Sequence, residues 1–340
     1  MRLFLGVDGG QTATKTVVGD EQGSIVAHAS GGPSNHTEEP GGPERLERVV
    51  LSTLREALTS IHISNPAEHE FAAACFGMTG ETEIKTRILK RIVRCERLSV
   101  VHDSVNALAG ATAGQPGIIV IAGTGSVARG INAQGEEARV GGWGHQFGDE
   151  GSAYWIGREA VRATLALEDG FGPKTLLAPM LLGRLSVSSA YELMARYYSS
   201  EFSRDHLAGL ASWVSEAAES GDAVAREILR KAGSDLACHV AQMIPMLFPR
   251  QGEGGDHTQD TAGFPVCYTG GAFGSKYVLS GFTEHVRRDY PAVEIRPALL
   301  APVFGSLLLA YRASGIRIAP DTCVQWTTLE GKRKLSPGDR

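Results

Sequence analysis

The sequence has neither a surplus of positive charge nor a long apolar run. Lys and Arg number 33 against 38 Asp and Glu, a net charge of −5, whereas nucleic-acid surfaces need clustered positive charge. The longest apolar stretches, 117–122 and 299–310, are far shorter than the roughly 20 residues of a membrane span. Because Asp8 follows Met1 so closely, no signal peptide is expected. We therefore expect a cytoplasmic protein that binds a small molecule, with no nucleic acid and no membrane as partner.

Paired cysteines and the common nucleotide-binding motifs are missing as well. The five cysteines are scattered, without Cys-x-x-Cys or His-x-His spacing, so neither a disulfide framework nor a zinc site is expected. No G-x-x-x-x-G-K-[ST] loop occurs, and no glycine loop matches the full dinucleotide fingerprint followed by a helix. These absences argue against a P-loop enzyme and against hydride transfer.

Glycine, in contrast, is abundant. The chain has 42 glycines among 340 residues, which indicates many tight turns or loops that approach a ligand with their backbone. The length favours two lobes of roughly 150 residues each. Hydrophobic residues make up 42% of the chain, which suffices for a substantial interior.

The two halves of the chain open in the same way. Each half begins with three expected strands joined by tight turns: 3–8, 14–18 and 24–29 in the first, and 117–122, 127–131 and 136–140 in the second. We therefore expect each lobe to open with a β-meander.

Outside the meanders, strands alternate with helices and then give way to helices. The expected helices are 43–60, 82–93, 104–113, 152–167, 189–198, 205–220 and 223–248, and the further strands are 71–78, 98–102 and 266–269. This alternation predicts an α/β fold with helices packed on a sheet. The segment 250–263 is expected to be an exposed loop, and the tail after Ile316, which includes a basic stretch at 331–338, is expected to be solvated or disordered.

The first turn of each meander combines glycines with a hydroxyl. An ATP triphosphate needs backbone N–H donors at close range, and glycine lets the main chain approach. Either loop alone could be a plain hairpin turn, but the repetition favours phosphate binding. The expected ATP ligands are Gly9, Gly10 and Thr12 in the first loop, and Gly123, Thr124 and Gly125 in the second.

Two aspartates stand at expected strand ends. Asp8 comes just before the first glycine loop, where its carboxylate can reach a phosphate-bound Mg²⁺ through water, although a turn-capping role is the alternative. Asp103 stands between the strand 98–102 and the next helix. It suits a base that accepts the proton of an alcohol, but the residues alone favour a helix N-cap equally.

A fifteen-residue run from Gly141 to Trp155, GGWGHQFGDEGSAYW, carries a specific resemblance. Together with VDGGQT at 7–12, IAGTGS at 121–126 and TGGAF at 269–273, it resembles the N-acetylglucosamine kinase group of the BadF/BadG/BcrA/BcrD family. That family belongs to the actin, Hsp70 and hexokinase superfamily, and the resemblance spans about residues 3–313.

The resemblance implies a two-lobe actin-like ATPase fold of ribonuclease H type, with ATP in the cleft between the lobes. One lobe would comprise residues 1–113 and about 314–340, and the other 114–313. A helix at 301–314 resembles one that packs between lobes, where Gly305 would allow close packing at a hinge. Gln11 departs from the usual third glycine of the first loop and is expected to point outward.

The resemblance also implies the chemistry. ATP and Mg²⁺ would be the cofactors, Asp103 the catalytic base, and the 6-hydroxyl of an amino sugar, first of all N-acetylglucosamine, the acceptor. Glucosamine or another hexose stays open, and a homodimer is expected. Gly270 and Gly271 would lie against adenosine and Ala218 near adenine. The implied sugar ligands are Asn35, Asp103, Ser126, Val127, Gly142, Trp143, Gly144 and Asp149.

Some residues stay ambiguous at this point. Trp143 between glycines is also compatible with ordinary core, His145 is expected to be structural, and Glu150 is left open because a negative charge near a helix start is favourable in any case. The segment after the strand 71–78 could border the acceptor site, which the sequence does not show.

Two other functions compete with a kinase. One is an ATPase that activates 2-hydroxyacyl-CoA dehydratases, but the cysteine that would ligate its iron–sulfur cluster ahead of the second glycine loop is missing from IAG at 121–123. The other is a non-catalytic sugar sensor, for which a helix-turn-helix would precede the first strand at Leu3.

Overall fold

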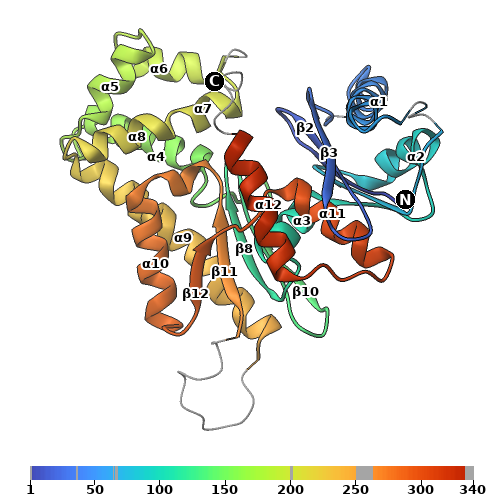
Figure 1. The fold of residues 1–340 in the computed structure, drawn as a ribbon. Coiled ribbons are helices and arrows are strands. Elements are labelled where there is room, and N and C mark those ends of the chain that lie inside the picture. The colour runs from blue at the N-terminus through green and yellow to red at the C-terminus, as the bar shows by residue number, and fades with distance from the viewer. Residues whose placement is uncertain are drawn as a thin grey trace. The chain divides into compact units, whose positions relative to one another are not determined.

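The computed structural model describes residues 2–35, 37–63, 65, 68–199, 202–249 and 263–333. It divides into two compact units, one formed by residues 1–116 and 297–340 and the other by residues 117–296. Each unit contains a five-stranded sheet (Figure 1). No helix within the described ranges is long and apolar enough to cross a membrane. Most of the expected loop at 250–263 lies outside the described residues.

The sheet of the first unit joins a meander to two parallel strands. Its strands are β1 (Phe4–Gly9), β2 (Thr14–Gly19), β3 (Ile25–Gly31), β5 (Ala73–Met78) and β7 (Leu98–His102), in the order β3-β2-β1-β5-β7. The first three pair antiparallel, and β5 and β7 run parallel to β1. The carboxyl ends of β1, β5 and β7 therefore meet at one edge of the sheet. A short parallel pair, β4 (Glu70–Phe71) and β6 (Arg94–Cys95), lies apart from this sheet.

Helices cover both faces of this sheet. Alternate residues of β1 point to opposite faces: Leu5 and Val7 belong to the cluster under α1 (Gly42–Ser60) and α2 (Thr82–Ile92), whereas Phe4 belongs to the cluster under α11 (Pro302–Ala313) and α12 (Pro320–Arg333). A further helix, α3 (Asp103–Ala111), packs along α11.

The position of α11 differs from the expected domain boundary. Residues 297–313 group with the first unit and not with the second. The physical reason is close packing, because a Cβ atom at Gly305 would collide with the backbone carbonyl of Asn106, and one at Gly6 would collide with the backbone of Leu307. Gly305 therefore serves the packing of α11 on α3 within one unit, and the expected placement of this helix in the C-terminal lobe was wrong.

The tail after Ile316 is ordered as α12, contrary to the expectation of a solvated segment. Cys323 and Trp326 are buried, Trp326 stacks on Phe304 with ring centroids 5.7 Å apart, and its Nε1 donates to the carbonyl of Gly23 at 2.9 Å. These side chains pack α12 into the cluster that contains Phe304. Residues 334–340 lie outside the described residues.

The second unit repeats the strand arrangement of the first. Its strands are β8 (Gly117–Ala122), β9 (Ser126–Ile131), β10 (Glu137–Gly141), β11 (Pro265–Thr269) and β12 (Glu294–Pro297), in the order β10-β9-β8-β11-β12. The first three form an antiparallel meander, and β11 runs parallel to β8. The predicted α/β class and the meander that opens each unit are confirmed.

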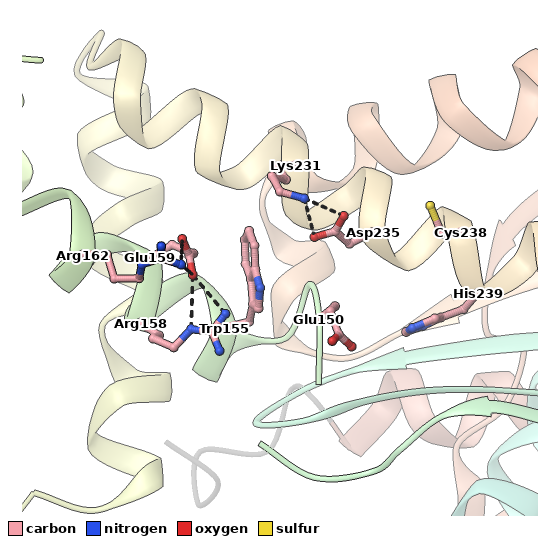
Figure 2. Close-up of a pocket in the computed structure, with 9 residues that line it drawn as sticks. All are labelled: Glu150, Trp155, Arg158, Glu159, Arg162, Lys231, Asp235, Cys238 and His239. Atoms are coloured by element: carbon pink, nitrogen blue, oxygen red, sulfur yellow. Dashed lines mark hydrogen bonds and ion pairs between the residues drawn. The ribbon is translucent and has the colours of Figure 1, made fainter. Parts of the chain in front are cut away.

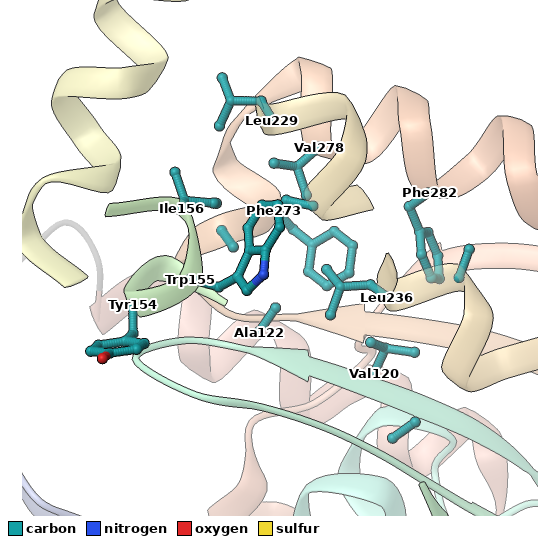
Figure 3. Close-up of a cluster of buried hydrophobic side chains, with 14 of the residues drawn as sticks. Val120, Ala122, Tyr154, Trp155, Ile156, Leu229, Leu236, Phe273, Val278 and Phe282 are labelled. Carbon is teal, nitrogen blue, oxygen red and sulfur yellow. The ribbon is translucent and has the colours of Figure 1, made fainter. Parts of the chain in front are cut away.

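Helices form the remainder of the second unit. They are α4 (Ala153–Glu168), α5 (Leu177–Arg184), α6 (Ala190–Tyr197), α7 (Arg204–Gly209), α8 (Ala211–Glu219), α9 (Ala223–Leu247), α10 (Lys276–Asp289) and the 3₁₀ turn η1 (Gly271–Gly274). The expected helix 205–220 is two helices that meet at Leu210, and α5, α10 and β12 were not predicted. Trp155, Phe273 and Phe282 anchor the core between the sheet and α9 and α10 (Figure 3).

Candidate active site

Three polar positions follow one another along the strand edge of the first unit. Gly9 pairs with Met78 and Met78 pairs with His102 in the parallel registers. Asp8, Thr79 and Asp103 are therefore carried to the same edge by three neighbouring strands. Such an edge is the usual place for a ligand site in a sheet of this kind.

His102, and not Asp103, occupies the N-cap position of α3. The N–H of Ser104 lies 3.3 Å from Nδ1 of His102, and the same nitrogen lies 2.8 Å from Oδ1 of Asp103. Nδ1 donates to the carboxylate when it is protonated and accepts from Ser104 when it is not. The alternative role of Asp103 as the cap of this helix is therefore wrong, and its carboxylate is available to the strand edge.

The carboxylate of Asp103 is ionised and partly accessible. The hydroxyl of Thr79 donates to its Oδ2 at 2.9 Å, and 38% of the side chain is exposed. Burial opposes the charge, but the hydrogen bond and charge of His102, followed by the bonds from Thr79 and Ser104, outweigh it and lower the pKa below the ordinary 3.8. This carboxylate can accept a hydrogen bond from a ligand hydroxyl without first losing a proton.

Asp8 has the opposite electrostatic balance. Burial raises its pKa, the hydrogen bond from Asn106 opposes this, the charge of Asp103 adds to the rise, and Lys15 lowers it. Nδ2 of Asn106 lies 3.1 Å from Oδ1 of Asp8. A bound cation would stabilise the negative charge of a buried carboxylate that lies near a second one. Carboxylate oxygens are also suitable ligands for Mg²⁺. The described residues contain no group of three His, Cys, Asp or Glu that could hold a metal.

Asn106 is a site residue that the sequence did not single out. It is fully buried on α3, and Nδ2 also lies 3.0 Å from Oγ of Ser306, whose hydroxyl donates to the carbonyl of Val7 at 2.7 Å. A Cβ at Gly77 would overlap the Asn106 amide. Asn106 thus fixes Asp8 from the neighbouring helix, through contacts that no local motif signals.

The first glycine loop is a tight turn backed by the chain that follows β3. Gly10 N–H donates to the carbonyl of Ala13 at 3.0 Å, while a Cβ at Gly9 would approach Oγ of the buried Ser34 to 2.6 Å. Gln11 and Thr12 are exposed, in agreement with the outward Gln11 that we expect. The packing of Ser34 on Gly9 carries the next residue, Asn35, towards this loop.

Asn35 has a buried amide that lacks a partner. Its side chain is 4% exposed, and Nδ2 has no hydrogen-bond partner among the residues that the structure describes. Its backbone carbonyl accepts from Arg45 at 2.8 Å. An unpaired buried N–H is unfavourable by about 1–3 kcal/mol, so a ligand oxygen would be a favourable partner.

In the second unit, two glycine turns lie side by side. Because β8 and β11 are parallel neighbours, their carboxyl ends bring Gly123 next to Gly270. Gly270 has φ +106°, and a Cβ there would collide with the backbone of Ala122. The carbonyl of Gly123 accepts from the N–H of Ala153 at 2.9 Å, which ties the loop to the start of α4.

Asp149 holds the second glycine loop in place. Its side chain is 4% exposed, and its Oδ1 accepts the N–H of Ser126 at 3.1 Å. Arg204 donates to Oδ2 at 2.8 Å. A Cβ at Gly125 would lie 2.8 Å from Oδ1 of Asp149, so the glycine is needed at this position. No local pattern in the sequence marks Arg204.

Trp143 is exposed and not part of the core. Its side chain is 70% exposed, and the guanidinium of Arg139 lies 4.6 Å from its ring centroid. Gly142 and Gly144 flank it with φ +73° and +83°, and a Cβ at Gly142 would contact Val127. The core alternative for Trp143 is wrong. The loop instead presents an aromatic surface next to Val127.

Two other predicted positions, His145 and Ala218, contact neighbouring residues of the second unit. His145 packs edge-on against Tyr154, with ring centroids 5.0 Å apart, and its expected structural role stays a prediction. Ala218 is fully buried, and its carbonyl already accepts from Nε of Arg226 at 2.9 Å and from the hydroxyl of Tyr277 at 3.3 Å. Its expected contact with adenine stays a prediction, and Tyr277, which follows the Gly270–Gly271 turn, is its polar neighbour.

Glu150 lines a separate pocket of about 390 Å³ on the second unit (Figure 2). Charged residues dominate its walls, but Arg158 pairs with Glu159 and Lys231 pairs with Asp235. Burial lowers the pKa of His239 here, and the charge of Glu150 opposes that shift. The charged side chains of this pocket therefore largely neutralise one another, and we do not include the pocket in the candidate active site.

Comparison with known proteins identifies the lineage of this chain. The model of the BadF/BadG/BcrA/BcrD ATPase family matches residues 5–310. The chain belongs to the BadF/BadG/BcrA/BcrD ATPase family. The resemblance carried by the glycine loops and the Trp143 run is thereby confirmed.

Members with curated names align over nearly the full length. The chain is 31% identical over 317 residues to the N-acetylmuramic acid/N-acetylglucosamine kinase of Clostridium acetobutylicum, covering 91% of this chain and 98% of the relative. It is 31% identical over 319 residues to the N-acetyl-D-glucosamine kinase of Dictyostelium discoideum, covering 91% and 97%. A solved structure of a candidate N-acetylglucosamine kinase from Chromobacterium violaceum superposes with a TM-score of 0.71 at 26% identity, covering 91% and 99%.

Proposed function

We propose that this member of the family is an ATP-dependent kinase that transfers the γ-phosphate to the 6-hydroxyl of an amino sugar, with N-acetylglucosamine as the first candidate. The observation that carries the proposal is the ionised, partly exposed Asp103 at the strand edge that also holds Asp8 and Gly9. The names of two relatives that are 31% identical support the acceptor class.

The nucleotide ligands are proposed for each unit separately. In the first unit, Gly9, Gly10 and Thr12 present backbone and hydroxyl donors to phosphate oxygens. In the second unit, Gly123, Thr124 and Gly125 do the same, while Gly270, Gly271 and Ala218 are assigned to adenosine. Asp8 fits Mg²⁺ through water, because burial and the charge of Asp103 disfavour its ionised carboxylate, and a bound cation would offset both. The ion, when bound, supplies positive charge that neutralises the phosphate oxygens.

Asp103 acts as the base in this proposal. The sugar hydroxyl donates its proton to the carboxylate while its oxygen forms the new bond to the γ-phosphorus, and the bond from that phosphorus to the leaving ADP oxygen breaks. A pKa below 3.8 makes the carboxylate a weak proton acceptor in the ground state. Its main contribution is therefore the orientation of the hydroxyl, which suits the loose transition state of phosphoryl transfer.

The sugar ligands are likewise proposed for each unit by itself. Asn35 offers an unpartnered buried amide for a ring hydroxyl or an acetamide oxygen. The second unit offers an apolar surface at Trp143 and Val127, polar backbone groups at Ser126, Gly142 and Gly144, and the lone pairs of Asp149 that its two protein donors leave unused. We place the activity in the cytoplasm, as the sequence leads us to expect, and expect a homodimer.

The test is a coupled assay of ADP release over a panel of hexoses and amino sugars, with the site of phosphorylation determined by NMR. Sugar-dependent ADP release and a 6-phosphate product are expected. Asp103→Asn should bind both substrates and lose nearly all turnover, whereas Glu83→Gln, which changes an exposed carboxylate, should retain it. If no sugar raises ADP release above the ATP-only blank, the proposed function fails.

A further inference from the structure

Lys85 is a fully buried cation that the proposed mechanism does not use. The residue is 1% exposed and is among the largest fully buried side chains described. It lies on α2, whose other buried residues are Ile88 and Leu89. Lysine is almost never fully buried unless its charge is compensated, so its position requires partners for the ammonium.

The ammonium of Lys85 is bound by backbone carbonyls of one turn. Nζ donates to the carbonyl of Thr79 at 2.7 Å and to that of Glu81 at 3.0 Å. These carbonyls flank Gly80, which has φ +80° and whose Cβ position is 3.4 Å from Nζ. The cation therefore lies under the turn that joins β5 to α2, and holds both of its ends.

The same turn carries a ligand of the proposed base. The hydroxyl of Thr79 donates to Oδ2 of Asp103 at 2.9 Å, while Oδ1 is held by the adjacent His102. His102, at the end of the preceding strand, thus holds Oδ1, and Thr79, in the turn that Lys85 binds, holds Oδ2. A continuous path of hydrogen bonds leads from Lys85 through Thr79 to Asp103.

We propose that Lys85 is a positioning residue that orients Asp103 through Thr79. Without the ammonium, the two carbonyls lose their common donor, the turn relaxes, and the Thr79 hydroxyl loses its fixed aim at Oδ2. The effect on turnover rests on the proposed function, because it requires Asp103 to be the base. The effect on the pKa of the Asp103 carboxyl does not depend on the proposed function.

The charges around Lys85 are consistent with a retained ammonium. Burial lowers its pKa, and the carboxylates of Glu38, Glu81 and Asp103 each oppose that shift. Around Asp103, the facing groups are His102 on β7, Asp8 on β1 and Lys85 on α2. Removal of the Thr79 bond withdraws one of the contacts that lower the pKa of Asp103.

A purely structural role for Lys85 would have a different signature. The N-cap of α2, Glu81, has no side-chain capping bond, so Lys85 could serve only to stabilise this turn and helix start. Its loss would then lower the melting temperature and leave the turnover of the folded protein unchanged. The measurements must therefore separate kcat from stability.

The kinetic experiment compares four variants of the full chain. Lys85→Met retains most of the aliphatic side chain and removes the N–H donors. Thr79→Val removes the hydroxyl at nearly constant shape, whereas Thr79→Ser retains the hydroxyl. Lys90→Met is the control, because it removes an exposed cation of the same helix. We expect kcat to fall about tenfold to hundredfold in Lys85→Met and Thr79→Val, with KM for ATP and sugar nearly unchanged. Thr79→Ser and Lys90→Met should remain near wild type. If Lys85→Met does not fold, Lys85→Gln, which retains N–H donors, is the substitute.

Titration of the Asp103 carboxyl by carbon-13 NMR gives a readout that does not need activity. The pKa of Asp103 should be higher in Thr79→Val and in Lys85→Met than in the wild type, and Thr79→Ser should restore it. A folded Lys85→Met protein with an unchanged Asp103 titration, or with wild-type kcat, would overturn the proposal. If the wild type has no sugar-dependent turnover, but Lys85→Met raises the pKa of Asp103 less in a Thr79→Val background than alone, the proposed function fails and the positioning role stands; an equal rise in both backgrounds would assign the shift to the lost charge and overturn the positioning role.

Discussion

Arg204 donates to Oδ2 of Asp149 at 2.8 Å across a sequence separation of 55 residues. The other oxygen of this carboxylate accepts the N–H of Ser126, and Asp149 has φ +63°, a conformation that is unusual for a residue with a side chain. One buried carboxylate therefore joins α7, the loop before α4 and the second glycine loop. The geometry of that loop therefore depends on Arg204, to which the proposed function assigns no ligand.

Arg204→Met should destabilise the second unit and weaken nucleotide binding. The change leaves Asp149 buried with one of its two donors removed, for which a loss of about 1–3 kcal/mol in the free energy of unfolding is expected. Urea unfolding measures it, with Arg162→Met as the control, because Arg162 forms an exposed pair with Glu159 and should change stability by about 0–1 kcal/mol. Equal losses in the two variants would contradict the role of Arg204.

Asp8→Asn should raise stability at neutral pH while it removes activity. The pKa of Asp8 in the folded protein is raised above 3.8, mainly by burial, so the folded state binds more protons than the unfolded state in the window just above that value. Stability therefore falls as pH rises through this window, and the neutral Asn escapes the loss. The gain of Asp8→Asn over wild type should be present at pH 7 and should shrink towards pH 4.

Urea unfolding at several pH values without divalent metal measures this difference. Glu21→Gln, which changes an exposed carboxylate, serves as the control and should show little gain at any pH. An Asp8→Asn protein that is less stable than wild type at pH 7 would contradict the electrostatic account of Asp8.

Gly270→Ala should be strongly destabilising, in contrast to Gly274→Ala. Gly270 has φ +106° and its Cβ would collide with the backbone of Ala122, whereas nothing lies within 4 Å of the Cβ position of Gly274. Strain and displacement of backbone should cost about 1–3 kcal/mol at Gly270, and the neighbouring Gly123 turn should move with it. Thermal unfolding and the KM for ATP check both effects, and a Gly270→Ala protein that melts like Gly274→Ala would refute the close approach of the two turns.

The sequence predicted those parts of the site that depend on local geometry. Gly9 and Gly270 were recognised, and at both positions a Cβ atom would approach a neighbouring residue too closely. Asp103 was recognised as a candidate, but only the structure gives the N-cap position to His102.

The parts that the sequence could not predict depend on contacts between distant segments. Asn106 reaches Asp8 over 98 residues, and Arg204 reaches Asp149 over 55 residues. The helix α12 was missed because, among those of its residues whose side chains the structure describes, Cys323 and Trp326 alone are buried. Gly305 was recognised as a packing glycine. Its contact with Asn106 on α3 places α11 in the first unit, and no local sequence pattern reveals that contact.

Trp143→Ala should weaken sugar binding without a loss of stability. The side chain is 70% exposed, so its removal uncovers little core, and thermal unfolding should change by no more than an ordinary surface substitution. If its ring packs on the apolar face of the sugar, the KM for the sugar should rise up to about tenfold, in line with an aromatic contact of roughly 0.5–1.5 kcal/mol. Phe171→Ala removes another exposed ring, 77% exposed, and should leave the KM for sugar and for ATP unchanged. An unchanged sugar KM in Trp143→Ala would remove this residue from the proposed sugar site, whereas a rise in the ATP KM alone would assign the exposed ring to the nucleotide.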